Sequence, residues 1–494
     1  MTIPFASVPS NLRVPFVAVE IDNSQAQQGP ALLAYRVLII GQKTSAGSAT
    51  ANTLHRVTTA DQVATLAGRG SQLHRMARAY FANNRFTDTW VGVLADNGSG
   101  VAATGTLTVT GPATADGTLS LYVAGDLVQV PVSSGDTATT VAAAIAAALP
   151  STSDLPVTGA IGGTGSEHIV TATARNKGTA GNDIDLRLNY QDGESTPAGI
   201  AVAIVDMASG ATNPVLTSLV AAMGDTWFQV VAHPYTDATS LTALEGELAD
   251  RFGPMRMIDG VAITSASGTQ SALGTLGDSR NSPHSIIIAQ PGANPLTPPA
   301  EFAAAVAAVV AFNAPRDPAQ PLQTLEVKGV LAPADADLFT LQERNLELYD
   351  GIATSKVSAG GQVQLERLVT TYQTNAAGSQ DTSYLDATTM LTLLYLRYSF
   401  RVQIQNRFPR AKLANDGVRL GPGQPVITPL IGKAEALNWF RDMEELGLVE
   451  GFAQFKADVV VERNVSDPNR LDFLLPPDLI NQFIVGGVSI QFKL

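Results

Sequence analysis

Apolar runs that recur along the chain, with helical patterns between them, are the feature that most constrains the fold. Five such runs are bounded by glycine or polar residues, at 35–41, 89–96, 227–233, 257–264 and 284–290. A short continuous apolar run is typical of a strand that is buried on both faces of a sheet. Buried strands that alternate with helices form a parallel sheet covered by helices. We therefore predict a central α/β domain formed by residues 26–98 and 195–370.

Local signals predict where two helices after the first run begin and end. Thr59, with Gln62 three residues later, is typical of a capping box, and Gly68 is suited to end the helix that follows. Ser71 is then expected to cap a second helix.

The composition changes between residues 101 and 200, where the chain has no Phe, Trp or Met and where Gly, Ala and Thr dominate. Alternating apolar residues at 119–123 and 128–132 flank a turn at 124–126, which predicts a β-hairpin. An Ala-rich helix at 139–149 and strands at 169–174 and 184–188 are expected to follow. We therefore predict a small β-rich domain, residues 99–194, inserted into the central domain.

The last part of the chain, residues 371–494, is predicted to be an α+β domain with helices near Thr388 and at 433–446 and a strand at 458–463. Its final segment, residues 482–494, alternates with period two, as half-buried strands do. This segment could pair with the strand at 458–463 of its own chain, or it could add to a sheet of another subunit. The residues expected to pack in that sheet are Ile484, Val488, Ile490, Phe492 and Leu494.

The opposite end, residues 1–25, is expected to be an extended arm, because Pro4, Pro9 and Pro15 hold their neighbours out of helical conformation. Residues 12–21 within it are β-rich and have no evident local partner. An exposed apolar strand is an aggregation hazard unless it is paired. The residues expected to pair this arm with another subunit are Val14, Phe16, Val17, Val19 and Ile21.

Charge and residue usage argue against several classes of function. The net charge is −13 and no basic run exceeds two residues, so we do not expect nucleic-acid binding. The absence of cysteine excludes disulfides, thiolate metal sites and cysteine nucleophiles. No signal peptide is visible, and the longest apolar run, residues 302–312, is too short to span a bilayer. We expect a chain that folds in the cytoplasm and does not bind membranes.

A search for catalytic chemistry finds no aligned motif. The five histidines form no HxxxH or HExxH pair, so no metal site is indicated. His233 is the best placed for catalysis, but the nearest candidate nucleophile segment, residues 268–272, is no GxSxG elbow. Segments 38–44 and 162–168 lack the glycine spacing that binds phosphate. We therefore expect no catalytic residues, no cofactor and no metal; an α/β hydrolase-like or nucleotide-binding enzyme is the alternative.

The most informative stretches are long and carry no catalytic motif. They are PLQTLEVKGVLAPADADLFTLQERNLELYDGIAT (321–354), VQLERLVTTYQ (363–373), DTSYLDATTMLTLLYLRYSF (381–400), FPRAKLANDG (408–417) and SDPNRLDFLLPPDLINQF (466–483). YRVLIIGQKTSAGSATA and LAGRGSQLHRMARAY add two more in the first hundred residues. Together they resemble a contractile tail sheath protein of Mu-like bacteriophages, over essentially the whole chain.

The resemblance implies a structural subunit that forms stacked hexameric rings, a six-start helical tube around an inner tail tube. It implies a central domain of subtilisin-like fold without a catalytic triad. It also implies an N-terminal arm and a C-terminal strand that add to the C-terminal domains of neighbouring subunits. Such a sheath contracts when it is triggered at the baseplate and drives the tube through the host envelope. The implied partners are other copies of the chain, the tail tube protein, and baseplate and tail terminator proteins.

The resemblance also indicates which part of the subunit faces the tail tube and which part lies on the outside of the sheath. The tube contact is expected on the C-terminal domain, where a predicted helix exposes Asp442, Glu444 and Glu445; a merely solvated helix face is the alternative. The insert is expected on the outside. The implied location is the virion tail, assembled in the host cytoplasm. A sheath of a phage-derived contractile injection particle is the remaining alternative.

Overall fold

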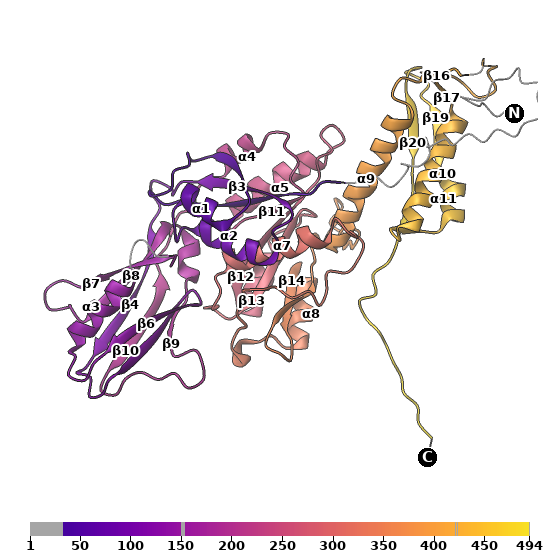
Figure 1. The fold of residues 1–494 in the computed structure, drawn as a ribbon. Helices are drawn as coiled ribbons and strands as arrows, with labels where there is room; N and C mark the ends of the chain where they lie inside the picture. The colour runs from indigo at the N-terminus through magenta and orange to yellow at the C-terminus, as the bar shows by residue number, and fades with distance from the viewer. Residues whose placement is uncertain (1–32, 150–153, 420, 422, 494) are drawn as a thin grey trace, which may run out of the picture. The chain divides into compact units, whose positions relative to one another are not determined.

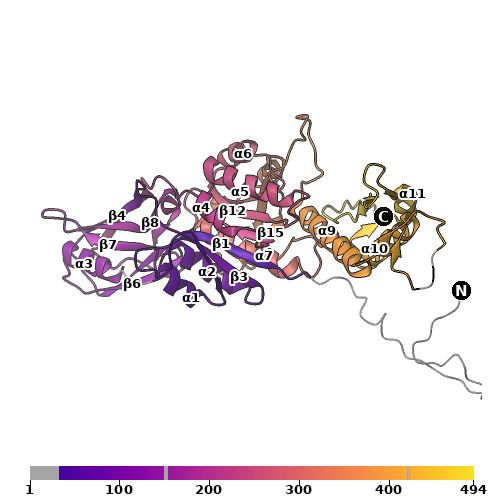
Figure 2. The same ribbon diagram turned by 90° about the horizontal axis from the view of Figure 1, so that it is seen from above.

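The structure is a computed structural model that describes residues 33–149, 154–419, 421 and 423–493 (Figures 1 and 2). The predicted N-terminal arm and Leu494 lie outside these residues. The chain divides into two compact units: the larger comprises the described residues of Leu33–Arg397, Leu446–Gly451 and Pro477–Leu494, and the smaller comprises those of Tyr398–Glu445 and Phe452–Pro476. The architecture mixes helices and sheets, in agreement with the predicted α/β class.

The centre of the larger unit is an eight-stranded sheet of order β15-β14-β13-β12-β11-β1-β3-β2. Its strands are β1 (Arg36–Gln42), β2 (Thr53–Val57), β3 (Asp88–Leu94), β11 (Val230–Ala232), β12 (Val261–Gly268), β13 (Ser285–Pro291), β14 (Ile352–Val357) and β15 (Val363–Arg367). The pairings from β14 through β3 are parallel, and the edge strands β2 and β15 are antiparallel. All five predicted buried strands are therefore found, and they lie in one sheet.

Helices cover both faces of this sheet, so that alternate residues of one strand enter different cores. Val37 and Ile39 of β1 pack with residues of α2 and α7, whereas Leu38 and Ile40 pack with residues of α4 and α5. The helices of this unit are α1 (Ala60–Ala67), α2 (Gln72–Asn83), α4 (Thr217–Met223), α5 (Ala238–Phe252), α6 (Gln270–Asp278), α7 (Pro299–Asn313) and α8 (Leu341–Tyr349), with the short η2 (Asp335–Asp337). Burial on both faces explains the uninterrupted apolar runs.

The predicted helix ends are confirmed, but the capping box at Thr59 is incomplete, because the Gln62 side chain accepts from the backbone N–H of Thr58, at 2.8 Å, and not from that of Thr59. The Thr59 side chain accepts a hydrogen bond from the backbone of Gln62 at 3.3 Å, and Gly68 ends α1 with a φ of 89°. Ser71 caps α2 by accepting from the backbone N–H of His74 at 3.2 Å. The Ala-rich run at 302–312 is part of α7, whose residues from Phe302 to Ala311 are all buried. Small side chains let this helix pack closely on all sides.

The insert leaves the sheet after β3 and returns before β11, and in both views its strands lie together at one end of the larger unit (Figures 1 and 2). It forms a sheet of order β10-β4-β8-β7 and a second of order β6-β5-β9, with a core of its own. Its elements are β4 (Ala102–Thr110), β5 (Gly117–Val123), β6 (Asp126–Val132), α3 (Ala138–Ala148), β7 (Val157–Ile161), β8 (Ile169–Lys177), η1 (Thr179–Asp183), β9 (Leu186–Leu188) and β10 (Ala201–Ala208). Because β10 pairs with β4, the insert's sheet continues past the expected boundary at residue 194.

The predicted hairpin is β5 and β6, closed by a two-residue turn. Val123 pairs with Asp126, and the turn residues Ala124 and Gly125 have φ values of 51° and 81°. Positive φ at both central residues is what a two-residue hairpin turn requires, because only that twist matches the strands on either side.

The smaller unit is built around an aromatic core. Its elements are the C-terminal part of α9 (Ala387–Arg407), β16 (Lys412–Leu413), β17 (Val426–Ile427), α10 (Pro429–Glu445), α11 (Phe452–Asp458), β19 (Val460–Arg463) and β20 (Leu471–Leu474). The rings of Phe440 and Phe455 stack at 4.2 Å, and Phe400 lies edge-on to Trp439 at 5.3 Å. The Trp439 indole N–H donates to Ser399 Oγ at 2.9 Å, which satisfies its buried donor. In the larger unit, β18 (Val449–Glu450) pairs with β21 (Asp478–Leu479).

One carboxyl group of α8 is buried without a partner. Glu347 is 0% exposed, and neither of its carboxylate oxygens has a hydrogen-bond partner among the described residues. Burial, with the nearby charges of Asp350 and Glu343, raises the pKa of Glu347 from its ordinary value of 4.5 to about 8. Since the folded pKa exceeds the unfolded one, the stability this group provides is complete below about pH 4.5 and is lost as the pH rises through 8.

We expect Glu347→Gln to leave stability nearly unchanged at pH 5 and to stabilise the chain by about 2–4 kcal/mol at pH 8.5, because glutamine has no proton to lose. Urea unfolding followed by tryptophan fluorescence at the two pH values measures the difference. Glu450→Gln, at an exposed position of the larger unit, is the control and should change stability little at either pH. A Glu347→Gln effect that is the same at both pH values would contradict the assignment.

Candidate assembly surfaces

The edge of the sheet where α/β enzymes bind ligands is occupied by the insert. Gln42, at the end of β1, donates to Asp96 Oδ1 and to the Lys177 carbonyl, each at 2.7 Å. Asn176 of the insert donates to the same Asp96 oxygen at 2.9 Å and accepts from the backbone of Gln72 at 2.8 Å. These polar groups, which lie where a ligand would be expected, bind one another instead.

The residues weighed for catalysis are not brought together. His233 is buried at the end of β11, neither ring nitrogen is hydrogen-bonded among the described residues, and burial lowers its pKa to about 4. Thr269 caps α6, and Asp237 caps α5 by accepting from the backbone of Ser240 at 3.0 Å. In the described part of the chain, no group of three or more His, Asp or Glu side chains could hold a metal ion. No described helix is long and apolar enough to cross a membrane.

The C-terminal segment presents its apolar residues to solvent. Residues 480–493 form no strand, whereas the sequence predicts one for 482–494. Val488 and Ile490 are each 86% exposed, and Val485 is 82% exposed. Ile484 differs, because it is half-buried and lines a small cavity with Pro321 and Leu322. The Gln323 side chain donates to the Phe483 carbonyl at 3.3 Å, near the start of the segment. Four apolar residues beyond it, Val485, Val488, Ile490 and Phe492, are thus left exposed.

The β19–β20 ribbon has two strand edges that pair with nothing in the described residues. Its two strands pair only with each other, in the register Val460 to Leu474. One face packs on α10, where Gly432 has no side chain and leaves room for Val461, Leu471 and Phe473. On the other face Val460 and Leu474 are exposed. A two-stranded ribbon is marginal alone, and further strands on its edges would stabilise it.

The three acidic residues proposed for the tube contact lie at the C-terminal end of α10. Asp442 and Glu445 are exposed, whereas Glu444 is half-buried and lies 3.4 Å from the Arg441 guanidinium. Partial burial, together with Glu445 and Glu435, raises the pKa of Asp442. The opposite side of the helix is fixed by buried Trp439, Phe440 and Met443.

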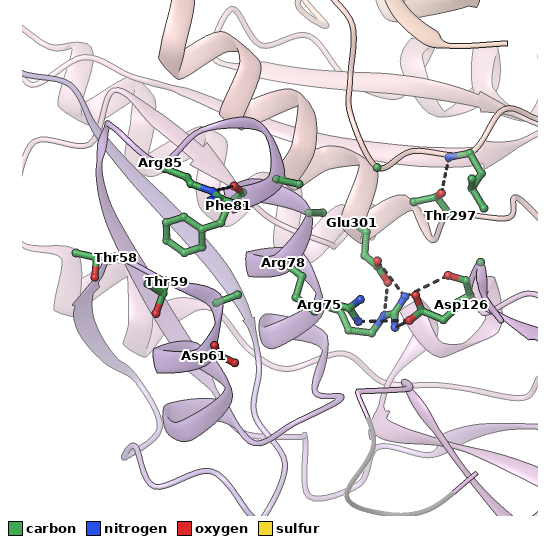
Figure 3. Close-up of a pocket in the computed structure, with 17 residues that line it drawn as sticks. Thr58, Thr59, Asp61, Arg75, Arg78, Phe81, Arg85, Asp126, Thr297 and Glu301 are labelled. Carbon is green, nitrogen blue, oxygen red and sulfur yellow. Dashed lines mark hydrogen bonds and ion pairs between the residues drawn. The ribbon is translucent and has the colours of Figure 1, made fainter. Parts of the chain in front are cut away.

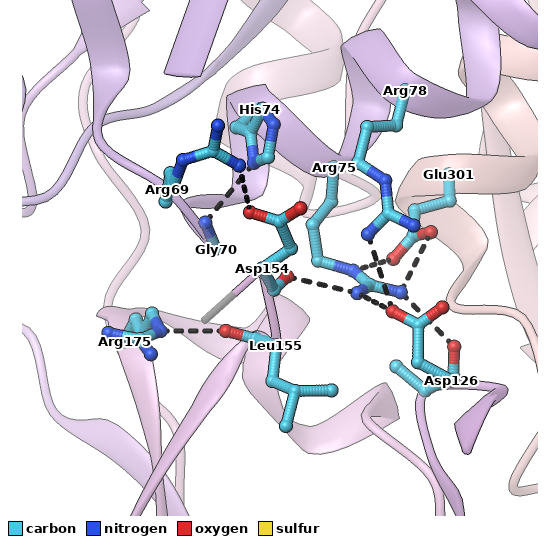
Figure 4. A network of polar contacts seen from close by, with 11 residues as sticks. Arg69, Gly70, His74, Arg75, Arg78, Asp126, Asp154, Leu155, Arg175 and Glu301 are labelled. Atoms are coloured by element: carbon cyan, nitrogen blue, oxygen red, sulfur yellow. Dashed lines mark hydrogen bonds and ion pairs between the residues drawn. The ribbon is translucent and has the colours of Figure 1, made fainter. Parts of the chain in front are cut away.

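Arg75 forms ion pairs that connect the insert to the central helices (Figures 3 and 4). The sequence analysis did not single out this buried residue. The Arg75 side chain on α2 binds both Glu301 oxygens, at 2.5 and 3.1 Å, and Asp126 Oδ2 at 2.5 Å. It also donates to the carbonyls of Ala124 at 3.1 Å and Asp154 at 3.2 Å. All five of its N–H donors are therefore used.

The partners of Arg75 come from both the central domain and the insert. Glu301 lies on α7 of the central domain, whereas Ala124, Asp126 and Asp154 belong to the insert. Burial alone would lower the pKa of Arg75, but Glu301 and Asp126 outweigh it, and the guanidinium stays charged. The sequence offered no signal for this role, because Gln72 and Arg78 lie on the same helix face as Arg75 and make it look like an ordinary polar face.

The family comparisons cover most of the chain. The model described as phage tail sheath protein central domain matches residues 209–371, and the one described as phage tail sheath C-terminal domain matches residues 379–493. The Mu-like prophage FluMu tail sheath protein of Haemophilus influenzae is 42% identical over 494 residues, which is 100% of each chain.

The comparison with solved structures finds sheath tail proteins of two bacteria. That of Desulfitobacterium hafniense is 14% identical, with a TM-score of 0.47 over 94% of this chain and 100% of that one. Lin1278 of Listeria innocua is 11% identical, with a TM-score of 0.48 over 92% and 94% of the two chains. The helical sheath of the anti-feeding prophage in its contracted state is 12% identical, with a TM-score of 0.47 over 98% and 99%.

We expect Arg75→Met to destabilise the larger unit by about 3–5 kcal/mol, because it leaves the Glu301 carboxylate buried without its cation. Urea unfolding measures the loss. Arg69→Met is the control: Arg69 pairs with Asp61 and Asp154 at the surface, so its removal should change stability little.

The double variant Arg75→Met/Glu301→Leu should recover most of the loss, since neither charge then remains buried. A double variant that is as unstable as the sum of its single changes would show that the two residues do not act as a pair.

Proposed function

Because this chain belongs to the phage tail sheath family, as its full-length relative shows, we propose that it is the structural subunit of a contractile tail sheath. In this proposal it polymerises around a tail tube and contracts to drive the tube through the host envelope. A tail sheath is a structural protein, not an enzyme.

The observation that carries the proposal is that two segments of the subunit lack a partner within the described residues: one could donate a strand and the other could accept one. The C-terminal segment exposes alternate apolar residues, and the β19–β20 ribbon has open edges. An extended peptide that adds to a sheet edge gains main-chain hydrogen bonds, and pockets for alternate side chains give it specificity. A donor strand and a distinct acceptor edge make a heterologous contact, which propagates as a ring or helix rather than closing a dimer.

The proposed exchange residues are those of the sequence analysis. On the C-terminal segment they are Ile484, Val488, Ile490, Phe492 and Leu494; on the N-terminal arm they are Val14, Phe16, Val17, Val19 and Ile21. Burial of a large apolar side chain is worth about 1.5–3 kcal/mol, so one strand gains on the order of 10 kcal/mol gross. The ordering of about a dozen residues offsets most of this gain. Each joint is therefore modest, and the lattice depends on many of them.

The finer parts of the proposal follow from the family resemblance. The sheath would be a stack of hexameric rings in the virion tail, assembled in the host cytoplasm. The tail tube would contact Asp442, Glu444 and Glu445; the exposure of Asp442 and Glu445 supports the assignment, whereas Glu444 is half-buried. Baseplate and tail terminator proteins would bind its two ends. The central sheet would be subtilisin-like in topology without a triad, and the insert would lie outside. A phage-derived injection particle would use the same contacts.

We expect the full chain to form tubes or rings, and a chain that ends at Gln482 to remain unassembled, by negative-stain microscopy and sedimentation. A monodisperse full-length monomer at high concentration would contradict the proposed function.

Point variants test the strand register within the segment. Val488→Ser/Ile490→Ser should raise the critical concentration for assembly by about 100-fold or more, since two apolar side chains on the buried face are lost. Val485→Ser is a matched control, equally exposed in the free subunit but on the opposite face of the predicted strand. An equal effect of the control and the double variant would argue against a period-two strand.

A further inference from the structure

We propose, on the premise that the C-terminal segment is exchanged between subunits as proposed above, that residues 482–484 stay bound to their own subunit and that the exchanged strand begins after Ile484. We call residues 482–484 the anchor. The backbone N–H of Ile480, directly after β21, donates to the Leu448 carbonyl at 3.2 Å, so the chain enters the anchor from a fixed position in the larger unit. Ile484, included above among the exchange residues, then remains with its own subunit.

Each residue of the anchor has a contact with its own subunit. The Gln482 side chain donates to Thr388 Oγ1, and the Phe483 carbonyl accepts from the Gln323 side chain at 3.3 Å. Gln482 and Ile484 are half-buried, whereas the Phe483 side chain between them is exposed. This alternation is typical of an extended chain that lies with one face on a surface. The three residues are therefore bound along their own subunit.

Ile484 lies beside the edge of the main hydrophobic core. The small cavity that it lines also has Pro321, Leu322 and Leu368 in its wall. Leu322 and Leu368 are buried and belong to the core that packs on one face of the central sheet. The partial burial of Ile484 here removes apolar surface from water, which stabilises the bound position of the anchor.

The charged residues that line this cavity are paired with other residues of the subunit. Arg367 donates to both carboxylate oxygens of Asp386, at 2.9 and 3.0 Å. Glu366 accepts from Arg344 at 2.8 Å. An apolar side chain such as that of Ile484 can therefore enter without leaving a lining charge unsatisfied.

The surface that receives the anchor is fixed to the central sheet. The backbone N–H of Thr324 donates to the Leu365 carbonyl at 2.7 Å, and the N–H of Leu365 donates to the Leu325 carbonyl at 2.9 Å. The loop that carries Gln323 is thus held against β15, the edge strand of the sheet. Thr388 is buried in the first turn of α9. The anchor consequently binds to a sheet edge and a helix start, which are ordered parts of the fold.

The chain leaves this surface directly after Ile484. Every residue from Val485 to Lys493 is exposed. Gly486 and Gly487 follow the anchor, and glycine has wide backbone freedom because it lacks Cβ, so the anchor does not dictate the direction of the residues beyond it. Each residue that the anchor holds in place is one fewer to be ordered when the exchanged strand binds a neighbour. The anchor thus prepares the segment for exchange.

The first test asks whether the anchor is bound within one subunit. Because the chain has no cysteine, Thr324→Cys/Phe483→Cys carries two thiols, both at exposed positions beside the contact between Gln323 and the Phe483 carbonyl. We expect a short bifunctional maleimide to join them within the monomer. The joined subunit should form tubes at the critical concentration of the unjoined variant or below it. Thr324→Cys/Val488→Cys is the control and should be joined at least tenfold more slowly in the monomer.

Two results of this test would overturn the proposal. One is a joined subunit that no longer assembles, and the other is a maleimide product that connects different subunits in tubes. The rate of cross-linking in the monomer is measured without assembly. Failure of the wild-type chain to form tubes would therefore count against the proposed function, whereas equal cross-linking rates for the test pair and the control pair would count against the anchor.

The second test distinguishes an anchoring residue from an exchanged one. We expect Ile484→Ser to raise the critical concentration about tenfold in the unjoined subunit and to have no such effect in the joined one, because the cross-link replaces the attachment that Ile484 provides. Val488→Ser/Ile490→Ser is the matched comparison, and its effect should persist in the joined subunit, since those side chains contact the neighbour. If Ile484→Ser impairs both subunits equally, or impairs neither, the proposal is wrong.

Discussion

Burial of the central parallel sheet on both faces is the constraint on which the larger unit depends. Every residue of β1 after Arg36 is buried, with odd and even positions entering different cores. Neither face of the sheet is left to bind a partner, and α7 is buried almost all round. Polar interactions and partners are consequently confined to strand ends, helix surfaces, the insert and the chain termini.

The insert takes the position that an enzyme of this architecture would use for its ligand. Its residues Asn176 and Lys177 bind groups at the carboxyl end of β1, and Arg75 fastens it to α2 and α7. A buried guanidinium is costly unless all its donors are satisfied. Here the five acceptors come from both domains, so the contact is specific as well as strong. An α/β domain can thus serve as a rigid structural body.

The C-terminal segment and the smaller unit, in contrast, are not fully buried within one subunit. The C-terminal segment and the β19–β20 ribbon leave apolar side chains and strand edges unpaired within one subunit. Most monomeric proteins protect such edges. In the proposed function, these edges are the positions at which neighbouring subunits join.

The sequence by itself determined the local structure of this protein. Apolar runs fixed the five buried strands, Thr59 and Ser71 fixed helix starts, and 124–126 fixed a hairpin turn, because period, capping and turn chemistry act over a few residues. The strand β10 was missed although its sequence, AVAIVDMA, is an apolar and β-branched run; only its pairing with β4 assigns it to the insert. The apolar alternation of residues 482–494 was recognised, but the segment forms a strand only if it pairs with the edge of another strand. Only the tertiary structure joined Arg75 to Glu301 across 226 residues and brought acceptors of the insert to the same side chain. Buried charges and open grooves depend on which distant segments meet, and no local pattern records that.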